Sequence, residues 1–182
     1  MAFAESALKL GAPTVVDMKK RIASLAKAKA ADVLRVTPDQ VIVRKIDPQD
    51  DLGLSDKVWS FVVNAGWNEV VSKVIPSNKV IYVYGFKVLH EDVVDDVSFI
   101  RLYKGNDLVY EDNIQEYYDG EKYQEIMLAR EVEYLPNDKL RLQIYAKSGA
   151  SSVTIKLAVL GYVGEKLGER ITSPLLHSNE IP

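Results

Sequence analysis

The fold is indicated most clearly by one stretch, Ile75-Pro-Ser-Asn-Lys-Val-Ile-Tyr-Val-Tyr-Gly-Phe-Lys-Val88. From Lys79 to His90 the side chains alternate between two faces, and apolar or aromatic residues occupy both of them. A strand that is apolar on both faces is buried on both sides, which places it at the centre of a β fold. The sequence predicts that one face of this strand is formed by Val80, Tyr82, Tyr84, Phe86 and Val88.

Shorter alternating segments surround this central strand and are joined by turns. Lys104-Gly-Asn-Asp107 and Pro136-Asn-Asp138 are strong turn signals. The segment 139–147 alternates, and its predicted inward residues are Leu140, Leu142, Ile144 and Ala146. Because strands do not alternate with helices, we expect a mainly β fold, an antiparallel jelly-roll-like β-sandwich, with another Greek-key sandwich as the alternative. The other predicted strands are 41–46, 58–64, 68–75, 97–103, 108–112, 123–134 and 153–163.

A basic, alanine-rich segment ahead of these strands has the pattern of a helix. Thr14 is a candidate N-cap, and Asp17 follows three residues later, where an acidic side chain favours the positive end of the helix dipole. Apolar residues then recur at helical spacing as far as Val33, and Pro38 disfavours helical geometry at the residue before it. The sequence predicts a helix over residues 15–35.

Turn-forming residues divide the chain into three predicted parts. The first boundary follows from a segment rich in turn-forming residues, Asp47-Pro-Gln-Asp-Asp-Leu-Gly53. The second follows from Gly164 and Pro174, which indicate an extended last stretch. We expect an N-terminal arm with the helix and a short strand over residues 1–50, the jelly-roll sandwich over 51–165, and an extended C-terminal tail over 166–182.

The predicted arm differs in charge from the rest of the chain. Residues 1–46 hold nine Lys/Arg and four Asp/Glu, a net charge of +5, whereas residues 47–182 carry −8. A basic segment of this kind contacts nucleic acid through phosphates, docks on acidic neighbours or folds back on its own domain, and charge alone does not choose among these. The helix residues expected to contact a partner are Met18, Lys19, Lys20, Ile22, Leu25 and Lys27.

Residue types exclude several kinds of chemistry. The 182-residue chain has no cysteine, which excludes disulfides, thiolate nucleophiles and Cys-based metal sites. His90 and His177 have no partner at metal-ligand spacing, and nucleotide-binding, serine-hydrolase and metalloprotease motifs are missing. We expect no catalytic residue, no metal site and no cofactor. Since the sequence has neither a membrane-length apolar run nor a signal peptide, we expect no membrane contact.

Two groups of side chains leave other functions open. Acidic tracts at 91–96 and 111–121 could hold calcium or act as the acid and base of a glycosidase, although solvated loops are the simpler interpretation. Trp67, Tyr117 and Tyr118 form a candidate aromatic platform for a sugar, with packing in the core as the simpler interpretation.

The strand stretches 75–88, 99–105 and 140–147 resemble those of jelly-roll structural proteins of virions, namely capsid, decoration and accessory proteins of bacteriophages and archaeal viruses. The resemblance covers about residues 58–163 and lies in the strand pattern, not in a diagnostic motif. It implies a shell subunit located in the virion, without catalytic residues, whose terminal arms reach neighbouring subunits.

The leading hypothesis is a non-enzymatic virion structural protein that oligomerises, binds other capsid or shell subunits and anchors through its N-terminal helical arm. Nucleic acid is a further candidate contact of the basic arm. The alternative is a carbohydrate-binding β-sandwich module or adhesin domain. A sandwich hydrolase that uses two loop carboxylates is a third hypothesis.

Overall fold

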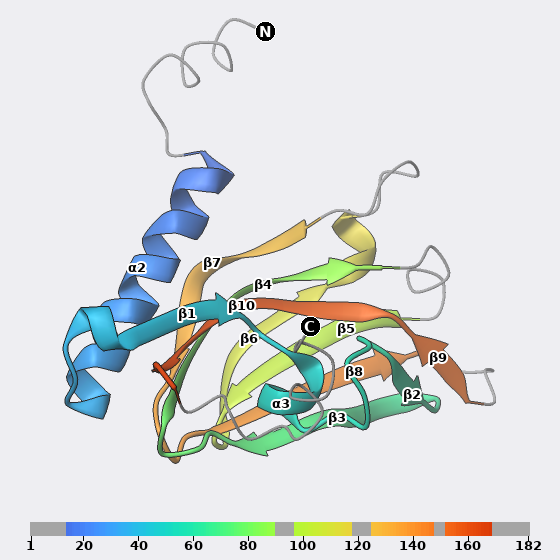
Figure 1. The fold of residues 1–182 in the computed structure, drawn as a ribbon. Helices are drawn as coiled ribbons and strands as arrows, with labels where there is room; N and C mark the ends of the chain where they lie inside the picture. The colour runs from blue at the N-terminus through green and yellow to red at the C-terminus, as the bar shows by residue number, and fades with distance from the viewer. Residues whose placement is uncertain (1–13, 90–96, 118–124, 148–151, 169–182) are drawn as a thin grey trace, which may run out of the picture.

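Two four-stranded antiparallel β-sheets face each other, and a long helix, α2 (Val15–Leu34), lies against the outer face of one of them (Figure 1). The computed structural model describes residues 14–89, 97–117, 125–147 and 152–168. The helix-covered sheet contains, in spatial order, β1 (Val41–Lys45), β10 (Leu157–Lys166), β4 (Lys79–Val88) and β7 (Glu125–Tyr134). The second sheet, which we call the open sheet, contains β3 (Gly66–Val74), β8 (Lys139–Ala146), β5 (Val97–Lys104) and β6 (Asp107–Asn113).

The path of the chain between the sheets is that of a jelly roll. Strands β1, β3, β4 and β5 alternate between the two sheets, β5 and β6 form a hairpin in the open sheet, and β7, β8 and β10 alternate again. A separate short pair joins β2 (Phe61–Val63) to β9 (Val153–Ile155). The predicted mainly β, antiparallel sandwich with an N-terminal helix is confirmed. Residues 1–13 of the predicted N-terminal arm and 169–182 of the predicted C-terminal tail lie outside the described residues.

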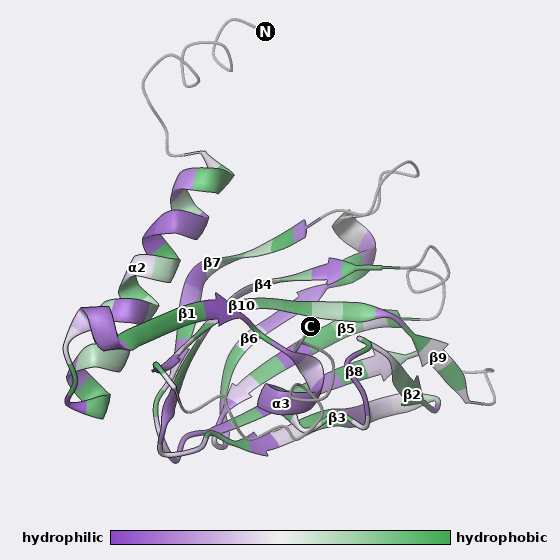
Figure 2. Ribbon diagram, viewed as in Figure 1, coloured by the Kyte–Doolittle hydropathy of each residue, from purple (hydrophilic) through white to green (hydrophobic). Residues whose placement is uncertain are grey.

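The main hydrophobic core fills the space between the two sheets. Phe86 of β4 is fully buried and stacks on Tyr110 of β6 with ring centroids 5.9 Å apart. Burial of each large apolar side chain contributes roughly 1.5–3 kcal/mol. The alternation predicted for β8 is confirmed, since its inward residues are buried: Leu140, Leu142, Ile144 and Ala146. Figure 2 shows hydrophilic and hydrophobic residues alternating around α2, as expected for a helix that buries one side.

The central position predicted for β4 is confirmed, but the predicted single face is wrong beyond Tyr84. β4 pairs with both β10 and β7, and its register with β7 shifts between Val83 and Gly85. An extra residue on one strand swaps the faces of those that follow. Tyr84 therefore lies under α2, whereas Phe86 lies in the core between the sheets. A side chain at Gly85 would collide with the backbone carbonyl of Ile126.

Helix α2 starts and ends as its residue types predict. Thr14 forms a capping box with Asp17: the Asp17 amide donates to the Thr14 hydroxyl at 3.2 Å, and the Thr14 amide donates to the Asp17 carboxylate at 3.1 Å. The hydrogen bonds from Thr14 lower the pKa of Asp17. Arg35 ends the helix in the left-handed conformation with φ of 53°. The predicted helix over residues 15–35 is thus confirmed to within one residue.

Residues 41–52 are more closely joined to the sandwich than the predicted division at residue 50 implies. β1 pairs with β10 along its whole length, from Val41 opposite Lys166 to Lys45 opposite Tyr162. The predicted turn-rich linker contains a short helix, α3 (Pro48–Leu52), capped by Asp47 and ended by Gly53 at φ of 73°. Proline at the first position and glycine just after the last are typical of a short helix as well as of a turn. β1 is therefore the edge strand of the helix-covered sheet.

The acidic tract at 111–121, for which a solvated loop was the simpler interpretation, is partly described. Its first residues belong to β6, and a 3-10 helix, η2 (Ile114–Tyr117), follows. Ile114 is buried in the core between the sheets. Residues 118–124 lie outside the described part of the chain.

Candidate functional site

Three aromatic side chains from three strands meet on the outer face of the open sheet. Tyr145 of β8 lies opposite Trp67 of β3 on one side and Phe99 of β5 on the other. The ring centroids are 5.3 Å apart for Trp67 and Tyr145 and 6.5 Å apart for Phe99 and Tyr145, in edge-to-face arrangements. Trp67 is nevertheless 40% exposed and Phe99 36% exposed. We call the surface formed by Trp67, Phe99, Arg101 and Tyr145 the aromatic face.

Arg101 is held on this surface by two contacts. Its guanidinium carbon lies 3.8 Å from the centroid of the Trp67 ring, and its Nε donates to the carboxylate of Glu111 on the neighbouring strand β6. An arginine over an indole ring is a favourable cation–π arrangement. Arg101 therefore fixes Trp67 while its own charge is balanced by Glu111.

Arg141, further along β8, repeats this arrangement. Its guanidinium carbon lies 5.0 Å from the centroid of Tyr103, and its Nε donates to Glu69 Oε2 at 2.6 Å. Burial alone would raise the pKa of Glu69, but the hydrogen bond from Arg141 lowers it. Each arginine on the outer face is thus paired with a glutamate of the same sheet.

The aromatic face has the residue types of a protein contact. Trp, Tyr and Arg are enriched among the residues that dominate the binding energy of protein–protein interfaces. A sugar that stacked on Trp67 would need an open ring face, and Arg101 occupies one of the two faces. The geometry suits contact with a protein surface at least as well as contact with a sugar.

Trp67, one residue of the predicted sugar platform, contacts aromatic residues that the sequence did not suggest as its partners. The partners of Trp67 among the described residues are Tyr145, Phe99 and Arg101. Tyr117 ends η2, and Tyr118 lies outside the described residues, so the prediction that they join Trp67 remains a prediction. Tyr145 could have been found from the alternation of segment 139–147, because inward residues at 144 and 146 leave the residue between them on the outward side.

Helix α2 packs closely on the helix-covered sheet because small residues lie at the contact. Gly164 of β10 lies against the helix so closely that a side chain there would be 2.7 Å from both the Ala26 carbonyl oxygen and the Ala30 methyl group. Ile22, Ala26 and Ala30 of the helix are fully buried against Tyr82 and its neighbours on the sheet. The alanine-rich composition of the segment therefore serves close packing on the sheet.

The basic charge of α2 is largely directed at its own domain. Three of its cations pair with glutamates of β7: Lys19 with Glu125 at 2.5 Å, Arg21 with Glu131 at 3.0 Å and Lys29 with Glu133 at 3.7 Å. Tyr82 of β4 also donates a hydrogen bond to Glu133. Of the three roles that the +5 charge left open, folding back on the domain is the one seen in the structure.

The six residues predicted as the assembly arm fall into two groups. Ile22 is buried, Met18 is half-buried and Lys19 is paired with Glu125. The other three are exposed: Lys20, Leu25 and Lys27. Only the second group is available on the surface of the helix.

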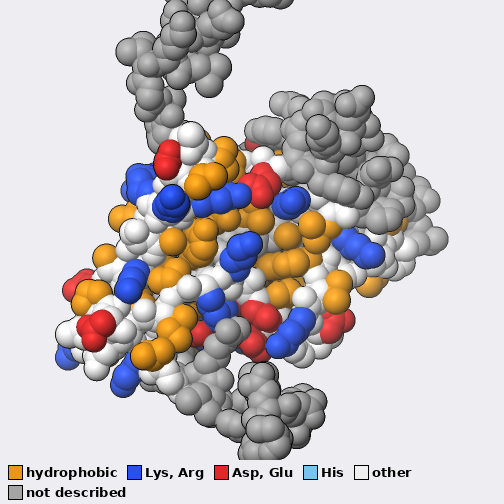
Figure 3. All heavy atoms as spheres, turned by 45° about the horizontal axis from the view of Figure 1, so that its top comes forward, with side chains coloured by type: hydrophobic (Ala, Val, Ile, Leu, Met, Phe, Trp, Pro, Cys, Tyr) orange, Lys and Arg blue, Asp and Glu red, His pale blue; other side chains and the backbone are white. Residues whose placement is uncertain are grey.

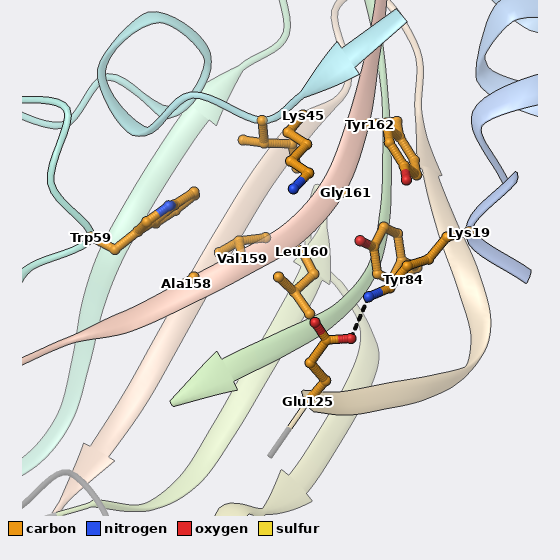
Figure 4. Close-up of a pocket in the computed structure, with 11 residues that line it drawn as sticks. Lys19, Lys45, Trp59, Tyr84, Glu125, Ala158, Val159, Leu160, Gly161 and Tyr162 are labelled. Atoms are coloured by element: carbon orange, nitrogen blue, oxygen red, sulfur yellow. Dashed lines mark hydrogen bonds and ion pairs between the residues drawn. The ribbon is translucent and has the colours of Figure 1, made fainter. Parts of the chain in front are cut away.

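A groove of about 150 Å³ lies beside α2 on the outer face of the helix-covered sheet. The outward residues of β10 form its floor, Trp59 lies on one side, and Lys19 and Tyr84 lie on the other (Figure 4). Figure 3 shows hydrophobic side chains reaching the surface between Lys and Arg side chains in this part of the molecule. The groove is lined by Lys19, Lys45, Ile46, Trp59, Tyr84, Glu125, Ala158, Val159, Leu160, Gly161 and Tyr162.

Four charged side chains form a buried cluster at the edge of the same sheet. Arg44 of β1 binds Asp51 of α3 at 2.5 Å and Glu165 of β10 at 2.7 Å, and Lys79 of β4 binds Asp51 at 2.8 Å. Asp51 is 0% exposed and Glu165 is 3% exposed. Burial alone would raise the pKa of Asp51, but hydrogen bonds from Arg44 and Lys79 lower it below 3.8. Two acids balanced by two bases make this ionic cluster a structural link between α3 and three strands.

The described residues give no support to the calcium site or to the catalytic carboxylates that the sequence left open. Among them, no group of three or more His, Cys, Asp or Glu side chains is arranged to hold a metal ion. Glu111 of the second acidic tract pairs with Arg101. The first tract at 91–96, His90 and His177 lie outside the described part of the chain. None of the described helices has the length and apolar character needed to cross a membrane.

Comparisons with known proteins give only distant likenesses. No family model and no curated protein matches the chain. The VP2 subviral particle of infectious bursal disease virus is similar with a TM-score of 0.33 at 11% identity, over 71% of this chain and 33% of that chain. A structure of the Gx strain of the same virus gives 0.30 at 14% identity, over 69% and 32%. This chain spans about a third of the length of each. TM-scores this low do not support an inference about this chain, so the fold class is assigned from the strand order.

Proposed function

We propose that this protein is a non-enzymatic structural subunit of a virion, a capsid, decoration or accessory protein that oligomerises through its aromatic face. The observation that supports this proposal is the exposed cluster of Trp67, Phe99, Tyr145 and Arg101 on the open sheet of a jelly roll. Arg101 on this face and Arg141 beyond it on the open sheet are each paired with a glutamate, so these arginines would not repel those of a second copy.

The outward side of α2 is the proposed anchor to a neighbouring shell subunit. Leu25 is 38% exposed and Val16 is 59% exposed, and Lys20 and Lys27 lie on the exposed side of the same helix. Val16, Lys20 and Lys27 follow one another at helical spacing, so one exposed apolar side chain lies beside two cations, and this combination suits contact with an acidic protein surface. Nucleic acid is the weaker candidate for this contact, since three other cations of the helix are paired with β7.

The test is self-association of the full chain by sedimentation velocity over a range of concentrations. We expect wild-type protein to form a discrete oligomer and the Trp67→Ala variant to lose it. Val62→Ala is the matched control, since Val62 is 65% exposed on β2 and lies outside the aromatic face. A protein that stays monomeric at every concentration, or a Trp67→Ala variant that associates like wild type, would contradict the proposed role of this face.

A carbohydrate-binding module or adhesin domain is the second candidate function. It is favoured by the exposure of Trp67 beside Tyr145 and Phe99. Glycan-array binding that disappears in Trp67→Ala, by a wild-type protein that does not self-associate, would select this function over the shell subunit.

A further inference from the structure

The groove beside α2 has the size of one large side chain. Its volume of about 150 Å³ is below the roughly 300–1,000 Å³ of typical small-molecule sites. An apolar cavity of about 150 Å³ is large enough to bind benzene. Ala158 and Leu160 provide an apolar floor, and Trp59 and Tyr84 border it on opposite sides (Figure 4). The geometry therefore suits an aromatic side chain presented by a peptide segment.

The charges around the groove restrict the occupant further. Lys19 and Glu125 neutralise each other at 2.5 Å. Lys45 is exposed, lines the groove and forms no ion pair with another residue of the described chain (Figure 4). A segment that carries an acidic residue close to its aromatic side chain would balance this lysine.

Residues 1–13 have both features in the required order. Phe3 is their one aromatic residue and Glu5 their one acidic residue, separated by Ala4. The segment joins α2 near the groove, because Lys19 lies about 6 Å along the helix axis from the first helical residue, Val15. The chain from Phe3 to Thr14 can extend up to ~36 Å, which is ample for it to fold back. Tethering by so short a linker raises the effective concentration to roughly the millimolar range.

We propose that the groove is the docking site for residues 1–13 of the same chain, with the Phe3 ring over Ala158 and Leu160 and Glu5 paired with Lys45. The docked segment would continue the coverage of the sheet beyond the start of α2. This inference goes beyond the proposed shell role and does not depend on it.

The absence of cysteine from the chain makes a clean cross-linking test available. The full chain is prepared with Ala4→Cys and Ala158→Cys, two small-to-small changes that place thiols on the segment and on the groove floor. A disulfide requires Cα atoms within about 7 Å. We expect an intramolecular disulfide under mild oxidation, seen by mass spectrometry and as a monomer on a non-reducing gel. The added change Phe3→Ala should abolish it.

The matched control pairs Ala4→Cys with Gln143→Cys, on the outer face of the open sheet, and should give no intramolecular disulfide. Equal cross-linking at both positions would overturn the proposal, as would no cross-link to Ala158→Cys. A disulfide-linked dimer in place of the intramolecular product would also overturn it, because the occupant would then be a second copy. Self-association is measured separately, so loss of the proposed shell role would leave this result unchanged.

A second measurement uses the two tryptophans as separate reporters. In a Trp67→Phe chain, the remaining Trp59 reports on the groove. Phe3→Ala should then increase quenching of Trp59 by acrylamide. In a Trp59→Phe chain, where Trp67 reports on the opposite sheet, Phe3→Ala should leave quenching unchanged. An unchanged Trp59 signal would contradict docking of Phe3.

Discussion

The helix-covered sheet hides its outward aromatic residues beneath α2, whereas the open sheet exposes them to solvent. Tyr82 and Tyr84 on the first sheet are 5% and 4% exposed, while Trp67 and Phe99 on the second are 40% and 36% exposed. Both sheets therefore carry aromatic side chains on their outer faces, and only one has a covering element within its own described chain. The difference supports the proposal that a partner covers the aromatic face, as α2 covers the outer face of the other sheet.

The charges of the two sheets follow the same division. On the helix-covered sheet, glutamates of β7 pair with cations of α2, so the ion pairs join two elements that would otherwise be separate. On the open sheet, Arg101 and Arg141 pair with glutamates on neighbouring strands of that sheet. Both arginines of the open sheet are thus paired within that sheet, and binding energy for a partner would come from the exposed rings.

The largest effect is expected at the buried ionic cluster, which has no counterpart among the described residues of the open sheet. Asp51→Ala should lower the free energy of unfolding by about 4 kcal/mol, because it leaves Arg44 and Lys79 buried beside a single carboxylate, Glu165. Urea denaturation provides the measurement. Asp50→Ala, at the exposed neighbouring position on α3, should change stability by less than about 0.5 kcal/mol. Similar losses for both variants would show that the short helix matters and the buried charges do not.

The same cluster gives the helix-covered sheet a specific pH dependence. The pKa of Asp51 is lower in the folded protein than its ordinary value of 3.8. Its ionised form therefore stabilises the fold above that value, and this contribution is lost as the pH falls below it. The stability difference between wild type and Asp51→Asn should be constant from about pH 7 to pH 5 and should shrink below about pH 4. A difference that does not change between pH 5 and pH 3 would contradict this assignment.

The next largest effect tests whether α2 is held by its buried side. Ile22→Ala should cost about 3 kcal/mol, because Ile22 is 1% exposed between the helix and the sheet and its loss leaves a cavity. Leu25→Ala, on the outward side of the same helix, should cost less than about 0.5 kcal/mol. Denaturant unfolding of the two variants gives the comparison. Equal small losses would mean that α2 is not a fixed cover of the sheet.

Local patterns were enough to predict several elements. The cap at Thr14, the helix that follows and the inward residues of β8 each depend on neighbours along the chain. The face switch in β4 could not be predicted, because a strand that is apolar on both faces gives no sign of where an extra residue enters. The helix α3 was missed because proline and glycine at its ends also mark turns.

The candidate surfaces were harder to predict than the elements, since each depends on strand register. The sequence placed Tyr145 on an outward face, but its position between Trp67 and Phe99 follows from pairing with β3 on one side and β5 on the other. The same holds for Glu131 and Glu133 of β7, whose cationic partners on α2 lie about a hundred residues away in the chain. Charge imbalance indicated a partner for the helix without showing that the partner is its own sheet.

A smaller effect is expected on the open sheet when assembly is absent. Trp67→Ala should lower the unfolding free energy of dilute monomer by about 1 kcal/mol, because its edge-to-face contact with Tyr145 is lost, although the side chain is already 40% exposed. Thermal and urea unfolding at low concentration provide the measurement. A loss of several kcal/mol would show that Trp67 supports the fold. Any effect of this variant on self-association would then be explained by its partial unfolding.

The smallest effect is expected at the exposed ion pairs between α2 and β7. Arg21→Gln should cost about 0.5 kcal/mol at low salt, because Arg21 is 60% exposed and a surface ion pair gains little over solvated charges. Since salt screens this pair, the difference from wild type should decrease further between low salt and about 1 M salt. Lys20→Gln is the matched control on the exposed side of α2 and should have no measurable effect. If Arg21→Gln instead cost as much as Ile22→Ala, charge pairing and not close packing would be the main reason that one sheet is covered and the other is not.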